Sequence, residues 1–121
     1  MARLTLRLDF DADRQVGPGK VRLLEAVERT GSISAAGREL GMSYRRAWLL
    51  IEDMNTCFKR PVVATQLGGS GGGGAQLTLF GRQVVAHYRA MEKEASAAAA
   101  RHIEALQRAL APKGRAASPT Q

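Results

Sequence analysis

The stretch GSISAAGRELGMSYRRAWLLIEDMN, residues 31–55, constrains the fold more than any other part of the chain. Its pattern predicts two short helices joined by a tight turn. Ser32 or Ser34 can cap the first helix by accepting a backbone N–H, and Ser43 can cap the second. Gly41 lies between them, where a glycine adopts a positive φ without a Cβ clash and ends the first helix. So short a turn fixes the angle between the helices, which is typical of a helix-turn-helix.

Apolar residues mark the buried face of each helix in this stretch. Ala35, Ala36 and Leu40 supply a narrow apolar face on the first helix. On the second helix, apolar residues recur at steps of three and four and form one stripe that is predicted to be buried. The stripe consists of Ala47, Trp48, Ile51, Met54 and Phe58.

The N-terminal end of the second helix is left free and carries Tyr44, Arg45 and Arg46. This end of a recognition helix meets base edges in the major groove of DNA. Arginine suits that role because its planar fork can bond guanine O6 and N7 together. The alternative is a helical hairpin of a small all-α domain whose arginines are solvated surface charges, since fold does not dictate function.

A glycine-rich β-hairpin is predicted directly after the second helix. An apolar run, residues 62–67, is followed by GGSGGGG and then by AQLTLFG, residues 75–81. β-Branched residues favour strands, and the glycines permit a tight connection. In this position the hairpin is a wing, whose backbone amides can approach a phosphate or the minor groove closely. A flexible linker is the alternative, whereas a P-loop lacks the Lys-Ser/Thr pair that should close it.

The residues SYRRAW, EDMN, the wing GGSGGGGAQLT and the following FG resemble the N-terminal DNA-binding domain of the ModE family of molybdate-responsive regulators. The resemblance covers about residues 17–88, and GSISAAGRELGMS is more weakly similar to LysR-type regulators. It implies a dimeric winged-helix transcription regulator that reads an operator with two recognition helices and serves molybdenum homeostasis. Because the chain ends at Gln121, we expect a single-domain form without the family's molybdate-binding domains, with any effector acting through a separate partner or at a dimer seam.

Two predicted elements precede the helix-turn-helix. The opening MARLTLRLDF alternates apolar and polar residues and predicts a half-buried strand that pairs with, or packs near, the wing. The following turn leads into a helix from about Pro18 to Thr30, with Val21, Leu24, Ala26 and Val27 on its buried face.

From Phe80 to about Leu110 the composition favours one long helix, rich in alanine, leucine, glutamate and arginine. The predicted fold is therefore mainly α with a small β-sheet. It comprises a winged helix-turn-helix over residues 1–80, a long dimerisation helix over 81–110 and a disordered tail over 111–121.

The long helix carries an apolar stripe with heptad-like steps of four and three. A helix that projects from so small a domain must bury its stripe, and the expected partner is the same helix of a second subunit. Packing on its own domain, or a partly frayed tail, are the alternatives. The predicted dimer interface is Val84, Tyr88, Met91, Ala95, Ala98, His102 and Leu106.

The chain is strongly basic. Its 18 lysines and arginines against 11 acidic residues give a net charge of +7, which attracts an anionic partner. Between Met54 and Met91 no acidic residue occurs, although Lys59, Arg60 and Arg82 fall there. The charge favours double-stranded DNA as the partner, with a solvated, solubilising surface as the alternative.

Other classes of function have less support. No segment approaches the roughly 18 to 20 consecutive apolar residues that span a bilayer, and no signal peptide is recognisable, so a cytoplasmic protein is expected. His87 and His102 belong to no metal-ligand spacing, and Cys57 is alone, with a redox switch as the less favoured reading. No catalytic set is recognisable, which predicts a protein that is not an enzyme and needs no cofactor or metal.

The predicted function is operator binding by a homodimer that reads an inverted repeat. Residues 43–46 are expected in the major groove, Ser32 and Ser34 at phosphates, and the wing on the adjacent backbone. The alternatives are a non-specific or architectural DNA-binding protein and a helix-mediated interaction module. The predicted DNA-binding residues are Ser32, Ser34, Arg38, Ser43, Tyr44, Arg45, Arg46, Lys59, Arg60, Gly69, Ser70, Gly71 and Gly72.

Overall fold

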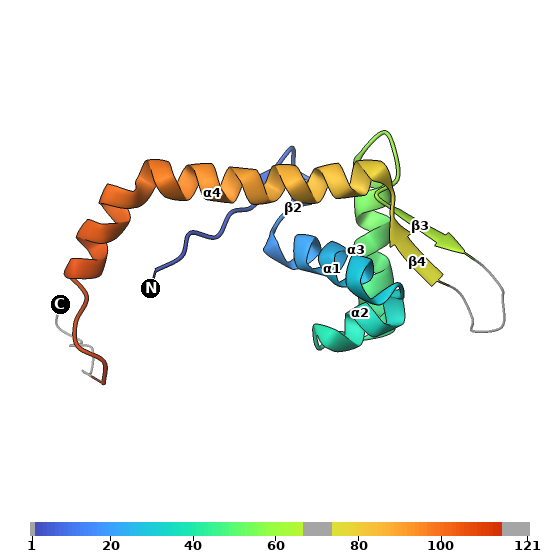
Figure 1. Ribbon diagram of the computed structural model, residues 1–121, viewed down its shortest axis with the longest axis horizontal. Coiled ribbons are helices and arrows are strands. Elements are labelled where there is room, and N and C mark those ends of the chain that lie inside the picture. The colour runs from blue at the N-terminus through green and yellow to red at the C-terminus, as the bar shows by residue number, and fades with distance from the viewer. Residues whose placement is uncertain (1, 67–73, 115–121) are drawn as a thin grey trace.

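The computed structural model describes residues 2–66 and 74–114 and is mainly helical (Figure 1). Three helices form a compact group, and a fourth, much longer helix lies along one side of the group and continues past it. The predicted mainly α fold with a small β component and a long C-terminal helix is confirmed. In chain order the elements are β1 (Leu8–Asp9), β2 (Gln15–Val16), α1 (Pro18–Thr30), α2 (Ile33–Glu39), α3 (Tyr44–Cys57), β3 (Val63–Gln66), β4 (Gly74–Leu77) and α4 (Leu79–Arg108).

Local signals set the starts and ends of the helices. The hydroxyl of Ser32 accepts the Ala35 N–H at 3.1 Å and caps α2, and that of Ser43 accepts the Arg46 N–H at 3.1 Å and caps α3. Gly41 has a φ of 71° between them, which confirms the predicted turn. Thr78 caps α4, so the second wing strand ends at Leu77, two residues before the helix begins.

The core lies where α1, α2 and α3 meet the wing strands and the first turns of α4. The buried residues of this cluster are Leu23, Leu24, Ala26, Val27, Ile33, Ala36, Ala47, Ile51, Met54, Val62, Val63, Ala75 and Leu77. The prediction that Trp48 belongs to it is wrong, because its side chain is 42% exposed. Ala47, Ile51 and Met54 already define the inner face of α3, and the rotation of about 100° per residue turns Trp48 to its edge.

The opening strand does not pair with the wing, which was the first of the two arrangements expected for it. Strand β1 pairs antiparallel with β2, with Leu8 opposite Val16, while β3 pairs with β4. The β1–β2 turn is closed locally, since the Asp11 carboxylate accepts the backbone N–H groups of Asp13 and Arg14 at 3.0 and 2.8 Å. A side-chain hydrogen bond from Arg14 further lowers the pKa of Asp11.

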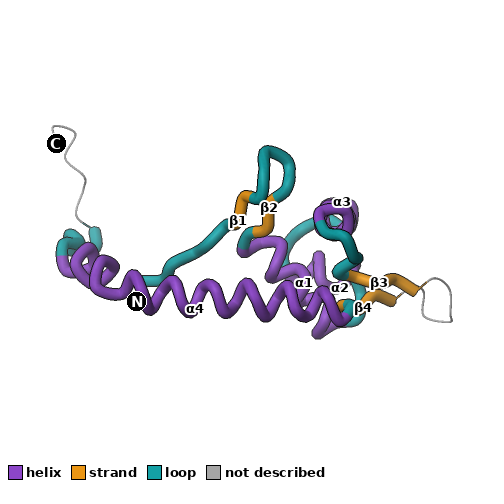
Figure 2. The backbone as a smooth tube through the Cα atoms, turned by 90° about the horizontal axis from the view of Figure 1, so that it is seen from above, coloured by secondary structure: helices purple, strands orange, loops and turns teal. Residues whose placement is uncertain are grey.

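The residues before β1 run beside α4, as both views show (Figure 2). The Tyr88 hydroxyl of α4 donates a hydrogen bond of 2.6 Å to the Leu6 carbonyl oxygen. Tyr88 packs with Val16 and Val21 in a second buried cluster and is only 1% exposed. The first half of α4 is therefore part of the folded domain.

No helix within the described ranges combines the length and apolarity needed to cross a bilayer. Charged residues occur on most turns of the long α4.

Helix α4 crosses the start of the wing at Gly81, where the backbone approach leaves no room for a side chain. A Cβ at this position would collide with the Val62 carbonyl oxygen and stand 2.9 Å from the carbonyl carbon. We expect Gly81→Ala to lower the free energy of unfolding by about 1–3 kcal/mol, because backbone must shift to admit the methyl group. Urea denaturation measures the change.

Gly19→Ala is the matched control for that measurement. A Cβ at Gly19 meets nothing within 4 Å, and alanine favours the helix by roughly 0.5–1 kcal/mol over glycine. Equal stability of the two variants would contradict the close contact between α4 and Val62.

Candidate DNA-binding surface

The start of α3 presents a cluster of exposed polar and cationic groups. Tyr44 is 57% exposed, and Arg45 and Arg46 are exposed beside it. Among the described residues, no carboxylate lies within 4.0 Å of either guanidinium, so both forks are free to donate. Figure 1 shows this end of α3 at α2, away from α4, where a second molecule has access.

The start of α2 lies next to this cluster. Ser32 uses its hydroxyl oxygen as the acceptor for the cap, which leaves its O–H free to donate. Ser34 accepts a hydrogen bond of 3.0 Å from the Arg38 guanidinium, which places that exposed arginine over the same helix end. The structure therefore brings together the predicted contact residues of α2 and α3.

A hollow of about 320 Å³ joins these two helix starts to the wing. Both strands of the wing contribute to it, and so does Trp48, which the sequence placed in the core. Its lining is Ser32, Ile33, Ser34, Tyr44, Trp48, Thr65, Gln66, Gly74 and Ala75. The sequence analysis did not include Trp48, Thr65 and Gln66 among the residues of this surface. For Trp48, a stricter helical wheel of α3 was the one available signal.

The side-chain amide of Asn55 attaches the wing to the recognition helix. Its Oδ1 accepts the N–H groups of Val62 and Val63 at 2.8 and 3.1 Å, and its Nδ2 donates to the Val63 carbonyl oxygen at 3.3 Å. On the other strand, the Ala75 N–H donates to the Gly31 carbonyl oxygen at 2.9 Å. These bonds fix the wing relative to both α3 and the α1–α2 junction.

Lys59 and Arg60 are not brought together with the other predicted contact residues. They follow α3 at the end opposite Tyr44, roughly 20 Å away along a helix of 14 residues. The Arg60 guanidinium lies 4.6 Å from the centre of the Phe80 ring, a cation–π contact that favours a partly structural role. The predicted wing-tip contacts Gly69, Ser70, Gly71 and Gly72 lie outside the described residues.

The predicted dimer residues divide into two groups along α4. Val84 and Met91 pack partly against their own domain, and Tyr88 is fully covered within its own chain, which corrects its assignment to a free interface. Ala95, Ala98, His102 and Leu106 lie farther along the helix, and none of them belongs to the two buried clusters of the described residues. Leu106 and Leu110 are 73% and 72% exposed.

Cys57 ends α3 on the side away from the exposed arginines. It is half-buried, and burial raises the pKa of its thiol. The thiol form therefore dominates at neutral pH, which agrees with a packing role for the residue.

The chain matches several curated bacterial proteins. It is 43% identical over 106 residues to the molybdenum transport protein ModE of Azotobacter vinelandii, a match that covers 88% of this chain and 38% of that protein. It is 38% identical over 87 residues to the transcriptional regulator ModE of Yersinia pestis, a match that covers 72% of this chain and 33% of that protein. The chain is a relative of the ModE regulators over their N-terminal region.

The molybdenum-pterin-binding protein MopB of Rhodobacter capsulatus is a further relative, 49% identical over 78 residues, which are 64% of this chain and 29% of MopB. The chain thus spans about a third of the length of the ModE proteins and MopB. No protein-family model matches it.

A solved structure, the crystal structure of a CbnR_DBD–DNA complex, contains a chain of similar fold. The two superpose with a TM-score of 0.55 over 73% of this chain and 95% of that one, at 17% sequence identity. Identity this low shows the fold alone, and it confirms the predicted winged helix-turn-helix.

Asn55 is the residue whose loss should disturb the surface without touching its exposed groups. We expect Asn55→Ala to cost about 1–3 kcal/mol of stability, because it leaves the N–H groups of Val62 and Val63 without their acceptor. The control is Thr56→Ala, since the Thr56 hydroxyl donates only to carbonyl oxygens of its own helix. Denaturant unfolding that places N55A level with T56A would refute the role of the amide.

Proposed function

We propose that this protein is a DNA-binding transcription regulator whose helix α3 reads an operator in the major groove. The free guanidinium groups of Arg45 and Arg46 at the capped start of α3 carry the proposal. They lie beside the start of α2 and the wing, the parts that a winged helix-turn-helix applies to the DNA backbone. Relatives named transcriptional regulators support the same reading.

Each group on this surface has a distinct task. The guanidinium forks of Arg45 and Arg46 donate to base edges, with guanine as the preferred base. The Ser32 hydroxyl and Arg38 donate to phosphates, which fix the register of the protein on the duplex. Trp48 and Tyr44 line the hollow between α3 and the wing, where their rings pack on deoxyribose or on a thymine methyl group.

We further propose that the protein binds DNA as a homodimer through α4. The first half of the helix is covered by its own domain, but Leu106 and Leu110 are exposed in the described part of the chain. Leucines this exposed favour burial by a second subunit, at about 25 cal/mol per Å² of apolar surface. We accordingly assign residues 1–80 to the DNA-reading domain and 81–110 to the dimerisation helix.

Side-chain size along α4 favours an antiparallel pair. Large residues lie at both ends, and the run Ala97–Ala100 lies in the middle, where two helices can approach closely. A two-fold axis near Ala97 sets Leu106 of one helix beside Tyr88 of the other, since both lie nine residues from the axis. There an apolar hollow of about 250 Å³ is open between α4 and the β1–β2 hairpin, lined by Phe10, Phe58, Phe80, Val84, His87 and Met91 among others.

Charge along α4 favours the same direction. Glu94 and Arg101 lie on one flank of the helix, two turns apart. In an antiparallel pair centred near Ala97, Glu94 faces Arg101 of the other subunit. A parallel pair in register would instead set each charge beside its own copy, which is repulsive.

The alternative functions, a non-specific DNA-binding protein and an interaction module, use the same surfaces without this symmetric arrangement.

The first functional test selects binding sites from a random duplex library in about 0.15 M salt, where weak electrostatic binding is suppressed. We expect an inverted repeat to be enriched. Arg45→Ala and Arg46→Ala should each cost roughly 1–3 kcal/mol of affinity on that sequence and relax preference at one base pair. Fluorescence of Trp48, the chain's single tryptophan, follows binding directly.

Lys113→Ala is the matched control for the two arginine variants, because it removes an exposed cation that lies beyond α4, away from the reading surface and from the proposed dimer interface. A loss of affinity that is equal on all sequences would reassign Arg45 and Arg46 to phosphates. Salt-sensitive binding with no enriched sequence would instead establish the architectural function, and the absence of binding would leave the interaction module.

The second test concerns the direction of the helices and starts from a Cys57→Ala background. His87 and Leu106 lie nineteen residues apart, roughly 28 Å along one helix, so a disulfide cannot join them within a chain. We expect the double variant His87→Cys/Leu106→Cys to form covalent dimers on mild oxidation. The single variant Leu106→Cys should not, because its two copies lie at opposite ends of an antiparallel pair.

Size-exclusion chromatography supplies the control for this interface. Leu106→Glu should give a monomer, whereas Gln107→Glu adds the same charge on the other side of the helix and should leave the dimer intact. Covalent dimers formed by Leu106→Cys alone would show a parallel pair.

A further inference from the structure

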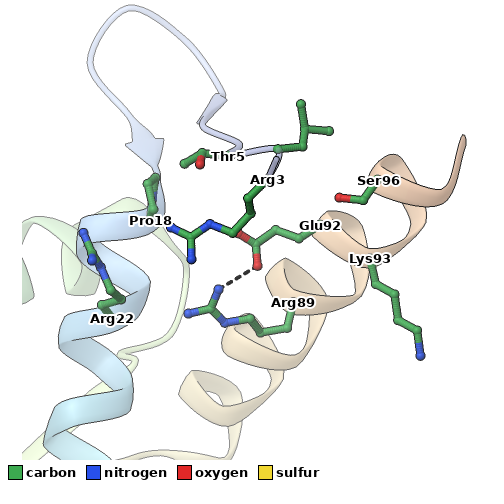
Figure 3. Close-up of a pocket in the computed structure, with 9 residues that line it drawn as sticks. Arg3, Thr5, Pro18, Arg22, Arg89, Glu92, Lys93 and Ser96 are labelled. Carbon is green, nitrogen blue, oxygen red and sulfur yellow. Dashed lines mark hydrogen bonds and ion pairs between the residues drawn. The ribbon is translucent and has the colours of Figure 1, made fainter. Parts of the chain in front are cut away.

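A second polar hollow of about 310 Å³ lies far from the DNA-reading surface (Figure 3). It opens between the residues before β1, the first turn of α1 and the middle of α4. The lining residues are Arg3, Leu4, Thr5, Pro18, Arg22, Arg89, Glu92, Lys93 and Ser96. Since α1 has 13 residues, its first turn lies roughly 20 Å from the end that leads to Ser32 and α2.

The carboxylates near this hollow are already occupied by one arginine. Arg89 donates to both oxygens of Glu25 at 2.7 and 2.9 Å, and to Glu92 at 2.6 Å. The hydrogen bonds from Arg89 lower the pKa of Glu25, so that carboxylate stays ionised and bound to Arg89 at neutral pH. The dashed line in Figure 3 marks the bond to Glu92.

Three other cations line the hollow without such a partner. Within residues 2–66 and 74–114, no carboxylate oxygen lies within 4.0 Å of a charged nitrogen of Arg3, Arg22 or Lys93. The residues around the hollow therefore include four cations and two carboxylates, counting Glu25, which binds Arg89. Figure 3 shows Arg3 reaching across toward Pro18, Arg22 rising along α1, and Lys93 extending away from both.

The neutral groups of the hollow add donors. Thr5 and Ser96 carry hydroxyl groups, and the Ser96 hydroxyl points toward Arg3 in Figure 3. The first turn of α1 contains no acidic residue, and its N-cap, Gly17, offers no side-chain acceptor, so the positive end of the helix is uncompensated. The site has a surplus of donors and of positive charge.

We propose that this hollow binds a small tetrahedral oxyanion of the phosphate class, held by the guanidinium groups of Arg3 and Arg22. Paired guanidinium forks and hydroxyl donors match the oxygens of such an anion, and two negative charges balance the surplus of four cations over two carboxylates. The anion joins the N-terminal residues to α1 and α4, so it stabilises the packing of α4 on the domain. This inference does not depend on the proposed DNA binding.

Thermal unfolding of the whole chain tests the site with inorganic phosphate as the probe. The comparison is between sodium phosphate and sodium chloride at equal ionic strength, because general screening then cancels. We expect phosphate to raise the Tm by several degrees more than chloride does, since a ligand that binds only the folded state stabilises it by mass action. ³¹P NMR line broadening of phosphate by the protein gives a second, independent readout.

Arg22→Gln and Arg3→Gln should each remove at least about half of the phosphate-specific shift in Tm. Lys113→Gln is the control, because it removes an exposed cation outside the hollow and beyond α4, and it should keep the full shift. Equal shifts in R22Q and K113Q, or no difference between the two salts, would overturn the site.

The same variants separate a free anion from a phosphate of the DNA backbone. If the hollow takes a free anion, R22Q and R3Q should bind duplex DNA as tightly as K113Q does in phosphate-free buffer. A loss of DNA affinity in R22Q and R3Q but not in K113Q would assign the hollow to the DNA backbone and overturn the proposal. Because a failure of all DNA binding leaves the phosphate measurements unaffected, the two functions can be judged separately.

Discussion

The amide of Asn55 is the interaction on which the DNA-reading surface depends. A hairpin of two four-residue strands is at best marginally stable alone, so its place must be fixed by other elements. Asn55 does this from within α3, because it bonds both the N–H groups and a carbonyl oxygen at the start of β3. Recognition helix and wing therefore move as one unit, and the hollow between them keeps its shape.

Much of this architecture was predictable because its signals are local. Helix α1 runs from Pro18 to Thr30 as predicted, and Ser32, Gly41 and Ser43 set the helix-turn-helix as expected. Capping and positive φ depend on a few neighbouring residues, so the sequence contains them in full. The exposed Tyr44, Arg45 and Arg46 follow from the same cap.

The features that sequence reasoning missed depend on partners distant in the chain. Trp48 is exposed because Ala47, Ile51 and Met54 already fill the inner face of α3 against the rest of the core, and a helical wheel alone gives only a weak signal for this. Tyr88 is buried because a carbonyl oxygen 82 positions earlier accepts its hydroxyl. Strand β1 could in principle pair either with β2 or with the wing. It pairs with β2 because the short turn at Asp11 closes a small loop, which costs less entropy than the long loop to the wing.

Helix α4 begins only one residue after the wing ends, with Thr78 alone between Leu77 and Leu79. The domain that carries the candidate DNA-binding surface therefore has no hinge at this junction. In the proposed homodimer, α4 would set the distance between the two DNA-binding surfaces. Each residue added to the helix would lengthen it by about 1.5 Å and turn the attached domain by roughly 100°. The length of α4 would thus set the phase of the two surfaces against the DNA helical turn of about 34 Å, with every residue proposed to contact DNA unchanged.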